Sequence, residues 1–117
     1  MIDEEFEITP VKTNEAWQSR QKLKMLQAER DNRLDNLTFT TPTGQCIQCR
    51  LRDEQFMRNA IERMQRLGLT EQTWRLSDNT MGVVTIADLQ SALDSGQDQG
   101  ADVWQWFMSE VSNISTS

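Results

Sequence analysis

Two cysteines, Cys46 and Cys49 in the segment GQCIQC, are the residues of this chain whose type and spacing could carry chemistry. A Cys-x-x-Cys pair can act as a redox dithiol or supply half of a tetrahedral zinc site. Zinc needs four ligands, but the sequence has no further cysteine and no histidine. A redox pair normally opens a helix, whose N-terminus lowers the thiol pKa. Here a helix is expected only from Asp53, several residues after Cys49.

The surrounding sequence LTFTTPTGQCIQC alternates in the manner of β-strands and contains turn residues. In a strand, residues three apart point to opposite faces and lie roughly 10 Å apart along the axis, too far for a disulfide. We therefore expect no zinc and no disulfide between the two cysteines of one chain. Cys49 shares its face with Ile47 and Leu51, which predicts a small buried apolar residue. Cys46 faces the other way, and a bond to another subunit stays open.

Other residue types that carry catalysis are also missing. The chain has no histidine and no tyrosine, and it shows neither a glycine-rich phosphate loop nor a calcium-binding loop. Adjacent acids such as Asp53 and Glu54 project in different directions and are typical of a solvated surface. The sequence therefore predicts a protein that is not an enzyme and has no cofactor.

Length and charge narrow the class of protein further. The chain has 117 residues, enough for one domain, and a net charge of −6. Residues 1–19 carry one lysine against five acids, residues 20–66 carry ten basic residues against six acids, and residues 67–117 carry one arginine against seven acids. The basic middle is interleaved with acids and lacks an exposed aromatic platform, so we expect charge complementarity within the chain or between subunits rather than nucleic-acid binding. No apolar run is long enough to suggest a membrane helix, and the acidic start is unlike a signal peptide.

The N-terminal part of the chain is expected to be an acidic arm followed by a helix. Residues 1–13 predict an extended arm, because Pro10 opposes an early helix start. Residues 14–35 are mostly strong helix formers, with apolar positions that are too irregular for a heptad since Arg30 and Arg33 interrupt them. This helix is expected to dock, either on its own domain or on a partner.

Residues 36–112 predict a small α+β domain. A hairpin around Thr41-Pro42-Thr43-Gly44 precedes a helix over 53–67, which Asp53 caps and Gly68 ends. A second hairpin over 73–85 turns at Asp78-Asn79, and Thr85 with Asp88 forms a capping box for the next helix. The polar segment GQDQG, Gly96 to Gly100, predicts a break before a short aromatic segment at 101–111. Residues 113–117 are expected to form a flexible tail.

The expected order is therefore α-ββ-α-ββ-α, with helices packed on a small antiparallel sheet. The predicted core consists of positions that share inward faces across both ββα units: Phe56, Ile61, Met64, Trp74, Leu76, Val83, Ile86, Leu89 and Leu93.

The segment from Arg58 to Leu93 resembles a family of domains encoded near tail-fibre genes in phages and prophages, often labelled tail-fibre or tail-assembly proteins. The family pattern has a hairpin, a helix ending in glycine, a Trp-x-x-x-Asp-Asn motif and a Val-x-Thr-x-x-x-Leu helix start. The matching positions in this sequence are Gly68, Trp74, Asp78, Asn79, Val83, Thr85 and Leu89. The resemblance covers about residues 20–110, and these motifs are structural signatures. The paired cysteines and the WQWF ending depart from the pattern.

The resemblance implies a structural component of a bacteriophage tail, located at the fibre base, baseplate or tail tip after assembly in the host cytoplasm. The alternative is an assembly chaperone that binds the fibre and leaves before the particle is complete, and a bacterial domain of regulatory role is a further one. The implied partners are tail or tail-fibre proteins, or further copies of this chain.

Large apolar residues at both ends of the sequence are the candidates for partner docking. Interfaces commonly depend on a few large side chains such as tryptophan. The candidate residues are Trp17, Leu23, Leu26, Trp104, Trp106 and Phe107. The alternative is that the aromatic segment folds back onto the domain's own core.

Overall fold

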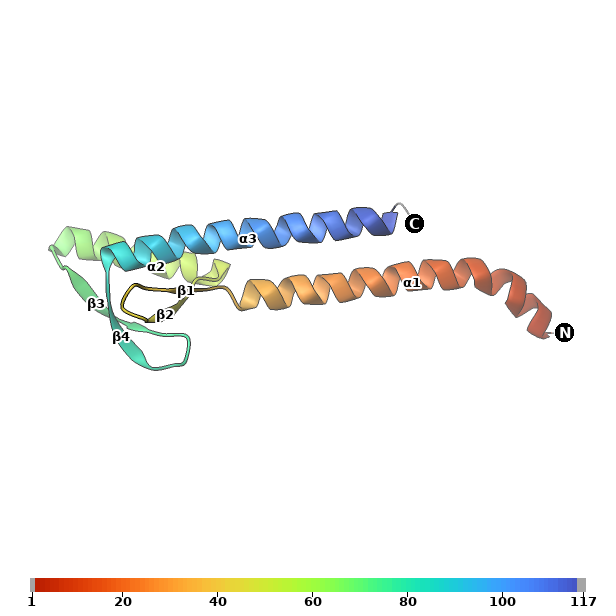
Figure 1. The fold of residues 1–117 in the computed structure, drawn as a ribbon, viewed down its shortest axis with the longest axis horizontal. Coiled ribbons are helices and arrows are strands. Elements are labelled where there is room, and N and C mark those ends of the chain that lie inside the picture. The colour runs from red at the N-terminus through yellow and green to blue at the C-terminus, as the bar shows by residue number, and fades with distance from the viewer. Residues whose placement is uncertain (1, 116–117) are drawn as a thin grey trace.

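Three helices and two β-hairpins make up the structure (Figure 1), a computed structural model that describes the backbone of residues 2–115 and the side chains of residues 15–114. The elements in chain order are α1 (Ile2–Asp35), β1 (Thr38–Thr40), β2 (Cys46–Gln48), α2 (Leu51–Leu67), β3 (Glu71–Arg75), β4 (Met81–Thr85) and α3 (Ile86–Ser115). The predicted α+β class and the order α-ββ-α-ββ-α are confirmed.

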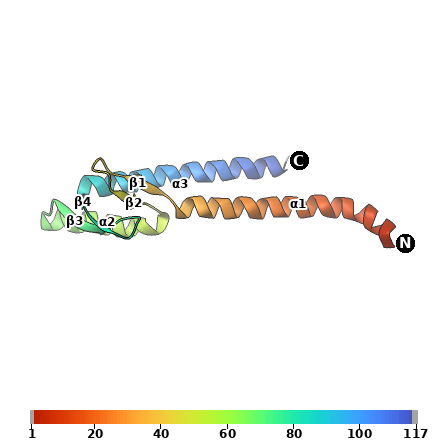
Figure 2. The ribbon, with the colours of Figure 1, turned by 60° about the horizontal axis from the view of Figure 1, so that its bottom comes forward.

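The molecule is elongated, with principal extents of 78 × 26 × 22 Å. The helix α2 and both hairpins gather at one end, which we call the small domain (residues 36–93). From this end, α1 and α3 run side by side in opposite directions, as the two views in Figures 1 and 2 agree. We call this pair of helices the arm, formed by residues 2–35 of α1 and residues 94–115 of α3.

The helix α1 begins earlier than expected. Residues 1–13 were predicted to form an extended arm, but the backbone is helical from Ile2 onward. Pro10 removes one helical hydrogen bond and crowds the preceding turn, which bends a helix without always ending it. Accordingly, the ribbon of α1 bends in its N-terminal part and continues (Figure 1). The predicted helix over 14–35 lies within α1.

Both hairpins form where the turn residues predicted them. In the first, the Gly44 amide donates to the Thr41 carbonyl at 2.9 Å, and Gly44 adopts a φ of 91°. In the second, Asn79 has a φ of 69°, and the Asp78 carboxylate accepts a 3.0 Å hydrogen bond from the Thr80 amide. The hairpins remain two separate two-stranded antiparallel sheets, β1–β2 and β3–β4, rather than one.

The ends of α2 and the start of α3 have well-defined caps. Arg50, and not Asp53, is the N-cap of α2, while Asp53 is the third helical residue and accepts from the Arg50 amide at 2.9 Å. At the other end, Gly68 adopts a φ of 69° and the Leu69 amide donates to the Met64 carbonyl, as expected for a glycine stop. Thr85 and Asp88 exchange hydrogen bonds of 3.0 and 3.1 Å, which confirms the predicted capping box of α3.

The core is shifted by one residue from the prediction at two places. Phe56 is 68% exposed and its neighbour Met57 is fully buried, because the buried face of α2 is Met57, Ala60, Ile61 and Met64. Val83 is half-exposed and Val84 is buried, since alternation along β4 places them on opposite faces. The remaining predictions hold: Ile61, Met64, Leu89 and Leu93 are buried, and Trp74, Leu76 and Ile86 pack against them.

The predicted break at Gly96 to Gly100 is absent, because α3 is one continuous helix through both glycines. Gly96 is buried, and a Cβ placed on it would lie 2.3 Å from the Cys49 carbonyl oxygen. Gly96 therefore lets α3 cross the end of the first hairpin at close range. Residues 113–115, predicted as part of a flexible tail, belong to this helix, and residues 116–117 lie outside the described residues.

The two glycines give a matched stability test. Gly96→Ala must push α3 away from Cys49, so we expect a loss of about 1–3 kcal/mol in the free energy of unfolding. At Gly100 the atom nearest a new Cβ is Leu37 Cδ1 at 3.9 Å, an ordinary contact. Gly100→Ala should therefore gain up to about 1 kcal/mol from helix propensity. Denaturant unfolding checks both, and equal effects of the two substitutions would contradict the close crossing.

Candidate docking surface

The two cysteines lie at the junction between β2 and α2. Both thiols are free, Cys46 being part-buried and Cys49 only 1% exposed. Leu51, expected on the same buried face, is instead exposed at the start of α2. A helix thus begins two residues after Cys49, closer than expected, although the helix N-terminus does not activate this thiol.

Burial, together with the smaller effects of the nearby Asp53 carboxylate and of Cys46, raises the pKa of the Cys49 thiol to about 11. At neutral pH the group is therefore protonated and is not a nucleophile. Among the described residues, no three potential metal ligands of the His, Cys, Asp or Glu type come together. The prediction that the chain binds no zinc stays a prediction.

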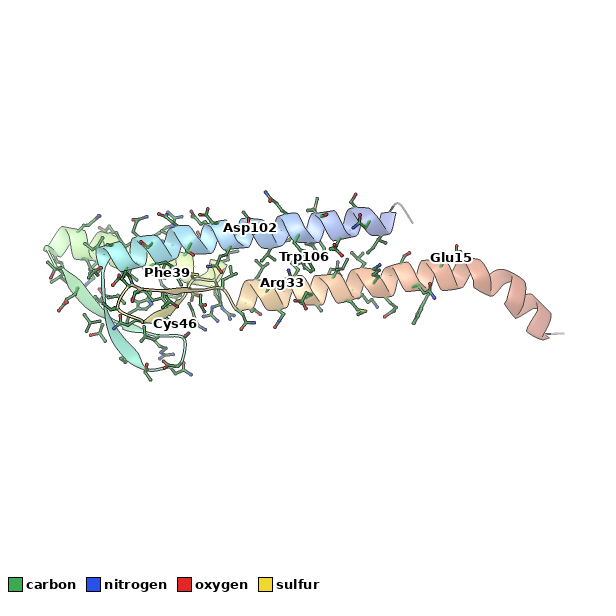
Figure 3. All side chains as sticks on the ribbon, in the orientation of Figure 1. Glu15, Arg33, Phe39, Cys46, Asp102 and Trp106 are labelled. Atoms are coloured by element: carbon green, nitrogen blue, oxygen red, sulfur yellow. The ribbon has the colours of Figure 1, made fainter. Side chains whose placement is uncertain are left out.

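The arm is held together by arginines of α1 that lie over aromatic rings of α3. The Arg30 guanidinium lies 4.9 Å from the Trp104 ring centroid and 4.6 Å from that of Phe107. The Arg33 guanidinium lies 3.7 Å from the Trp106 centroid, and these two labelled side chains meet between the helices in Figure 3. A cation over an aromatic face contributes about 0.5–2 kcal/mol. In the sequence, Arg30 and Arg33 interrupt the apolar positions of this helix. In the structure, they make the contact between α1 and α3.

Each arginine is also held in position along α1. Arg33 pairs with Glu29, one turn earlier, at 2.9 Å, and Arg30 pairs with Asp31 at 2.9 Å. On the other helix, the Trp104 and Phe107 rings meet edge to face with centroids 5.8 Å apart. The ion pairs restrain the two arginine side chains of α1, and the edge-to-face contact restrains the two aromatic rings of α3. Both partners of the contact are therefore held in position by their own helix.

The predicted docking residues divide into three groups by their exposure. Phe107 is buried against α1 and is not accessible to a partner in the closed arm, so its expected docking role stays a prediction. Trp106, Leu23 and Leu26 are half-buried in the arm. Trp104 and Trp17 remain 46% and 52% exposed and are the candidates that can still reach another protein.

The arm also carries a charge asymmetry. Residues 20–33 of α1 hold five basic residues against two acids, whereas α3 holds five acids and no basic residue. The positive net charge of residues 20–33 and the negative net charge of α3 favour the association of these two segments. This agrees with the expectation of charge complementarity within the chain.

The helix α1 continues past the end of α3, and we call residues 2–17 the overhang. Ile114, close to the C-terminal end of α3, lines a shallow hollow with four residues of α1: Glu15, Gln18, Ser19 and Lys22. The labelled Glu15 lies beyond that end in Figure 3, and no other described element lies beside the earlier turns in Figures 1 and 2. The exposed Trp17 therefore stands where the chain's own cover of α1 ends.

The buried thiol predicts a pH dependence of stability. Between pH 9.0, the ordinary value, and about 11, the unfolded chain loses the Cys49 proton while the folded chain keeps it. The free energy of unfolding should therefore be unaffected by this thiol below pH 9.0 and fall by about 2–3 kcal/mol on going to about pH 11. Denaturant titrations across this range measure the decline. Cys49→Ala lacks the titrating thiol and should decline less, and equal declines would contradict this assignment.

The contact between Arg33 and Trp106 predicts where the arm can be opened. Trp106→Ala removes the ring beneath the guanidinium, so we expect amide exchange in residues 20–33 of α1 to accelerate about tenfold. Trp17→Ala removes an equally large but exposed side chain and should leave this exchange unchanged. Hydrogen exchange followed by mass spectrometry measures both. Unchanged protection in Trp106→Ala would show that this contact does not hold the arm closed.

Comparison with protein families, with curated proteins and with solved structures gives no match. Among the described residues, no helix is long and apolar enough to cross a membrane. What can be inferred about function from the structure therefore depends on the arm and on the small domain.

Proposed function

We propose that this protein is a non-enzymatic structural component of a bacteriophage tail, at the fibre base, baseplate or tail tip, and that it acts by docking onto other tail proteins. The assignment to a phage tail is supported by the resemblance of residues 58–93 to tail-fibre-associated domains. In this proposal the protein is assembled in the host cytoplasm and retained in the particle in several copies.

The observation that carries the docking part is the uncovered overhang. A long helix in water depends mainly on the packing of one face against another element, because propensity alone gives little stability. Beyond the end of α3, no other described element lies beside the backbone of α1, and Trp17, which is close to that end, is 52% exposed. Large exposed tryptophans are favoured anchors of protein interfaces. A second protein or a second copy that covers this helix would provide the missing packing.

The closed arm supports the assignment of docking to the overhang rather than to the aromatic segment of α3. Because Phe107 and the half-buried Trp106 are engaged with α1, the aromatic segment serves mainly to hold the arm together. Docking is then assigned to Trp17 on the overhang and to the exposed part of Trp104. The small domain, at the opposite end of the molecule, would remain free for other contacts (Figure 1).

The test is whether the protein enters the phage particle through Trp17. We expect mass spectrometry of purified particles to detect the wild-type chain and to find the Trp17→Ala variant at about a tenth of the wild-type amount or less. The matched control is Met81→Ala, which removes another exposed apolar side chain, on the small domain, and should be incorporated normally.

The outcomes separate the proposal from its alternative. A chain that co-purifies with unassembled fibre protein in lysed cells but is missing from particles would be an assembly chaperone. A chain found in neither place, or equal incorporation of both variants, would contradict docking through the overhang.

A further inference from the structure

One edge of the β3–β4 hairpin is open. The Leu76 amide donates to the Thr80 carbonyl at 2.7 Å, so Leu76 and Thr80 are a hydrogen-bonded pair next to the turn. Antiparallel ladders alternate between bonded and non-bonded pairs. Trp74 and Gln72 therefore bond to β4, whereas Thr73 and Arg75 direct their backbone N–H and C=O groups away from it.

The strand β2 has a second open edge, which faces the open edge of β3. The Cys49 amide donates to the Leu37 carbonyl at 3.0 Å, so the odd-numbered residues of β2 bond to β1, and Cys46 and Gln48 point outward. The two edges meet once, where the Ser77 amide donates to the Cys46 carbonyl at 2.9 Å. Beyond this bond the two strands belong to separate sheets, and no backbone hydrogen bond joins Gln48 to Arg75 in the described structure.

An open groove of about 650 Å³ fills the space between the separated edges. Gln48 and Arg50 line one wall, and Thr73, Trp74 and Arg75 line the other. Phe56 of α2 also lines the groove, which is where this exposed aromatic residue is located instead of in the core. The groove therefore combines strand edges with free backbone hydrogen-bonding groups and two aromatic side chains.

The charges that line the groove favour an acidic occupant. Asp53 is neutralised by Arg50, whose Nε lies 2.8 Å from the carboxylate. Arg75 is exposed and makes no ion pair with any described side chain, so it leaves one uncompensated positive charge on the groove wall. An acidic side chain that extends from an occupant beside β3 would meet this charge.

We propose that this groove binds an extended acidic segment of a partner protein, which adds to the free edge of β3 as a further strand. Strand addition gains affinity from main-chain hydrogen bonds and specificity from alternate side chains. Here the main-chain groups are those of Thr73 and Arg75, and the side-chain contacts are made by Phe56 and Trp74. This site lies on the small domain and is independent of docking through the overhang.

The edge of β3 allows a test that changes one hydrogen bond and spares the fold. Thr73→Pro removes the outward N–H without touching the ladder to β4, a position at which proline is tolerated in edge strands. The matched control Thr73→Val keeps the N–H. The probe is a fluorescent peptide of about eight residues that alternates valine and glutamate, the length of a typical strand. Fluorescence anisotropy with the full-length protein measures its binding.

We expect the wild type and Thr73→Val to bind the probe equally and Thr73→Pro to bind it about tenfold more weakly. N-methylation of alternate probe amides on the edge facing β3 should abolish binding. Arg75→Glu, which leaves the backbone intact, should reverse the preference toward a probe with lysine in place of glutamate. This second variant keeps the test decisive if the proline variant does not fold.

Three results would overturn the proposal. One is the absence of binding of the acidic probe to the wild type, and another is equal binding of the N-methylated probe. The third is dimerisation of the wild type that Thr73→Pro abolishes, since this would identify the occupant as β3 of a second copy, with Glu71 facing Arg75 across the pair.

Discussion

The close crossing of α3 over the end of β2 is the constraint on which the rest of the structure depends. At Gly96 the helix backbone approaches the Cys49 carbonyl so closely that no side chain fits between them. Because α3 is continuous on both sides of this point, the crossing determines two contacts at once. Toward its start, Leu89 and Leu93 enter the core, and toward its end, Trp104 to Phe107 reach α1. The same crossing buries Cys49 and keeps its thiol protonated, as its raised pKa indicates.

Local signals in the sequence were sufficient for the element order, the turns and most caps, because each depends on a few neighbouring residues. Gly68 ends α2 as its position indicated, and Asn79 has the positive φ expected at the turn of the second hairpin. The wrong predictions concern features that depend on tertiary contacts rather than on neighbouring residues. The polar segment between Gly96 and Gly100 has the composition of a loop, but it is helical, and Gly96 serves close packing against Cys49. Whether Phe56 or Met57 faces the core is a difference of one helical position, which periodicity alone resolved wrongly.

The candidate surfaces were predictable only in part. The sequence identified the tryptophans as candidates for docking. It could not show which of them are buried against other parts of the same chain. Arg30 and Arg33 were missed because an apolar stripe was taken as the condition for helix pairing, whereas here two cations meet aromatic faces. A signal was available: basic residues on one helix and an aromatic cluster on an otherwise acidic one. The groove beside β3 has no local signature, because it exists only through the separation of two hairpins that are distant in the sequence.

The wide sequence separation within the arm has a consequence for the order of folding. Arg30 and Trp104 lie on opposite sides of the whole small domain in the sequence, so their contact closes a long loop that contains this domain. Closing a long loop has an entropic cost that is lower once the intervening residues are compact. During synthesis, α1 emerges first and stays solvent-exposed until the last turns of α3 leave the ribosome. We therefore expect the arm to form last, over a domain that is already folded, and its aromatic and basic faces to be accessible to other chains until then.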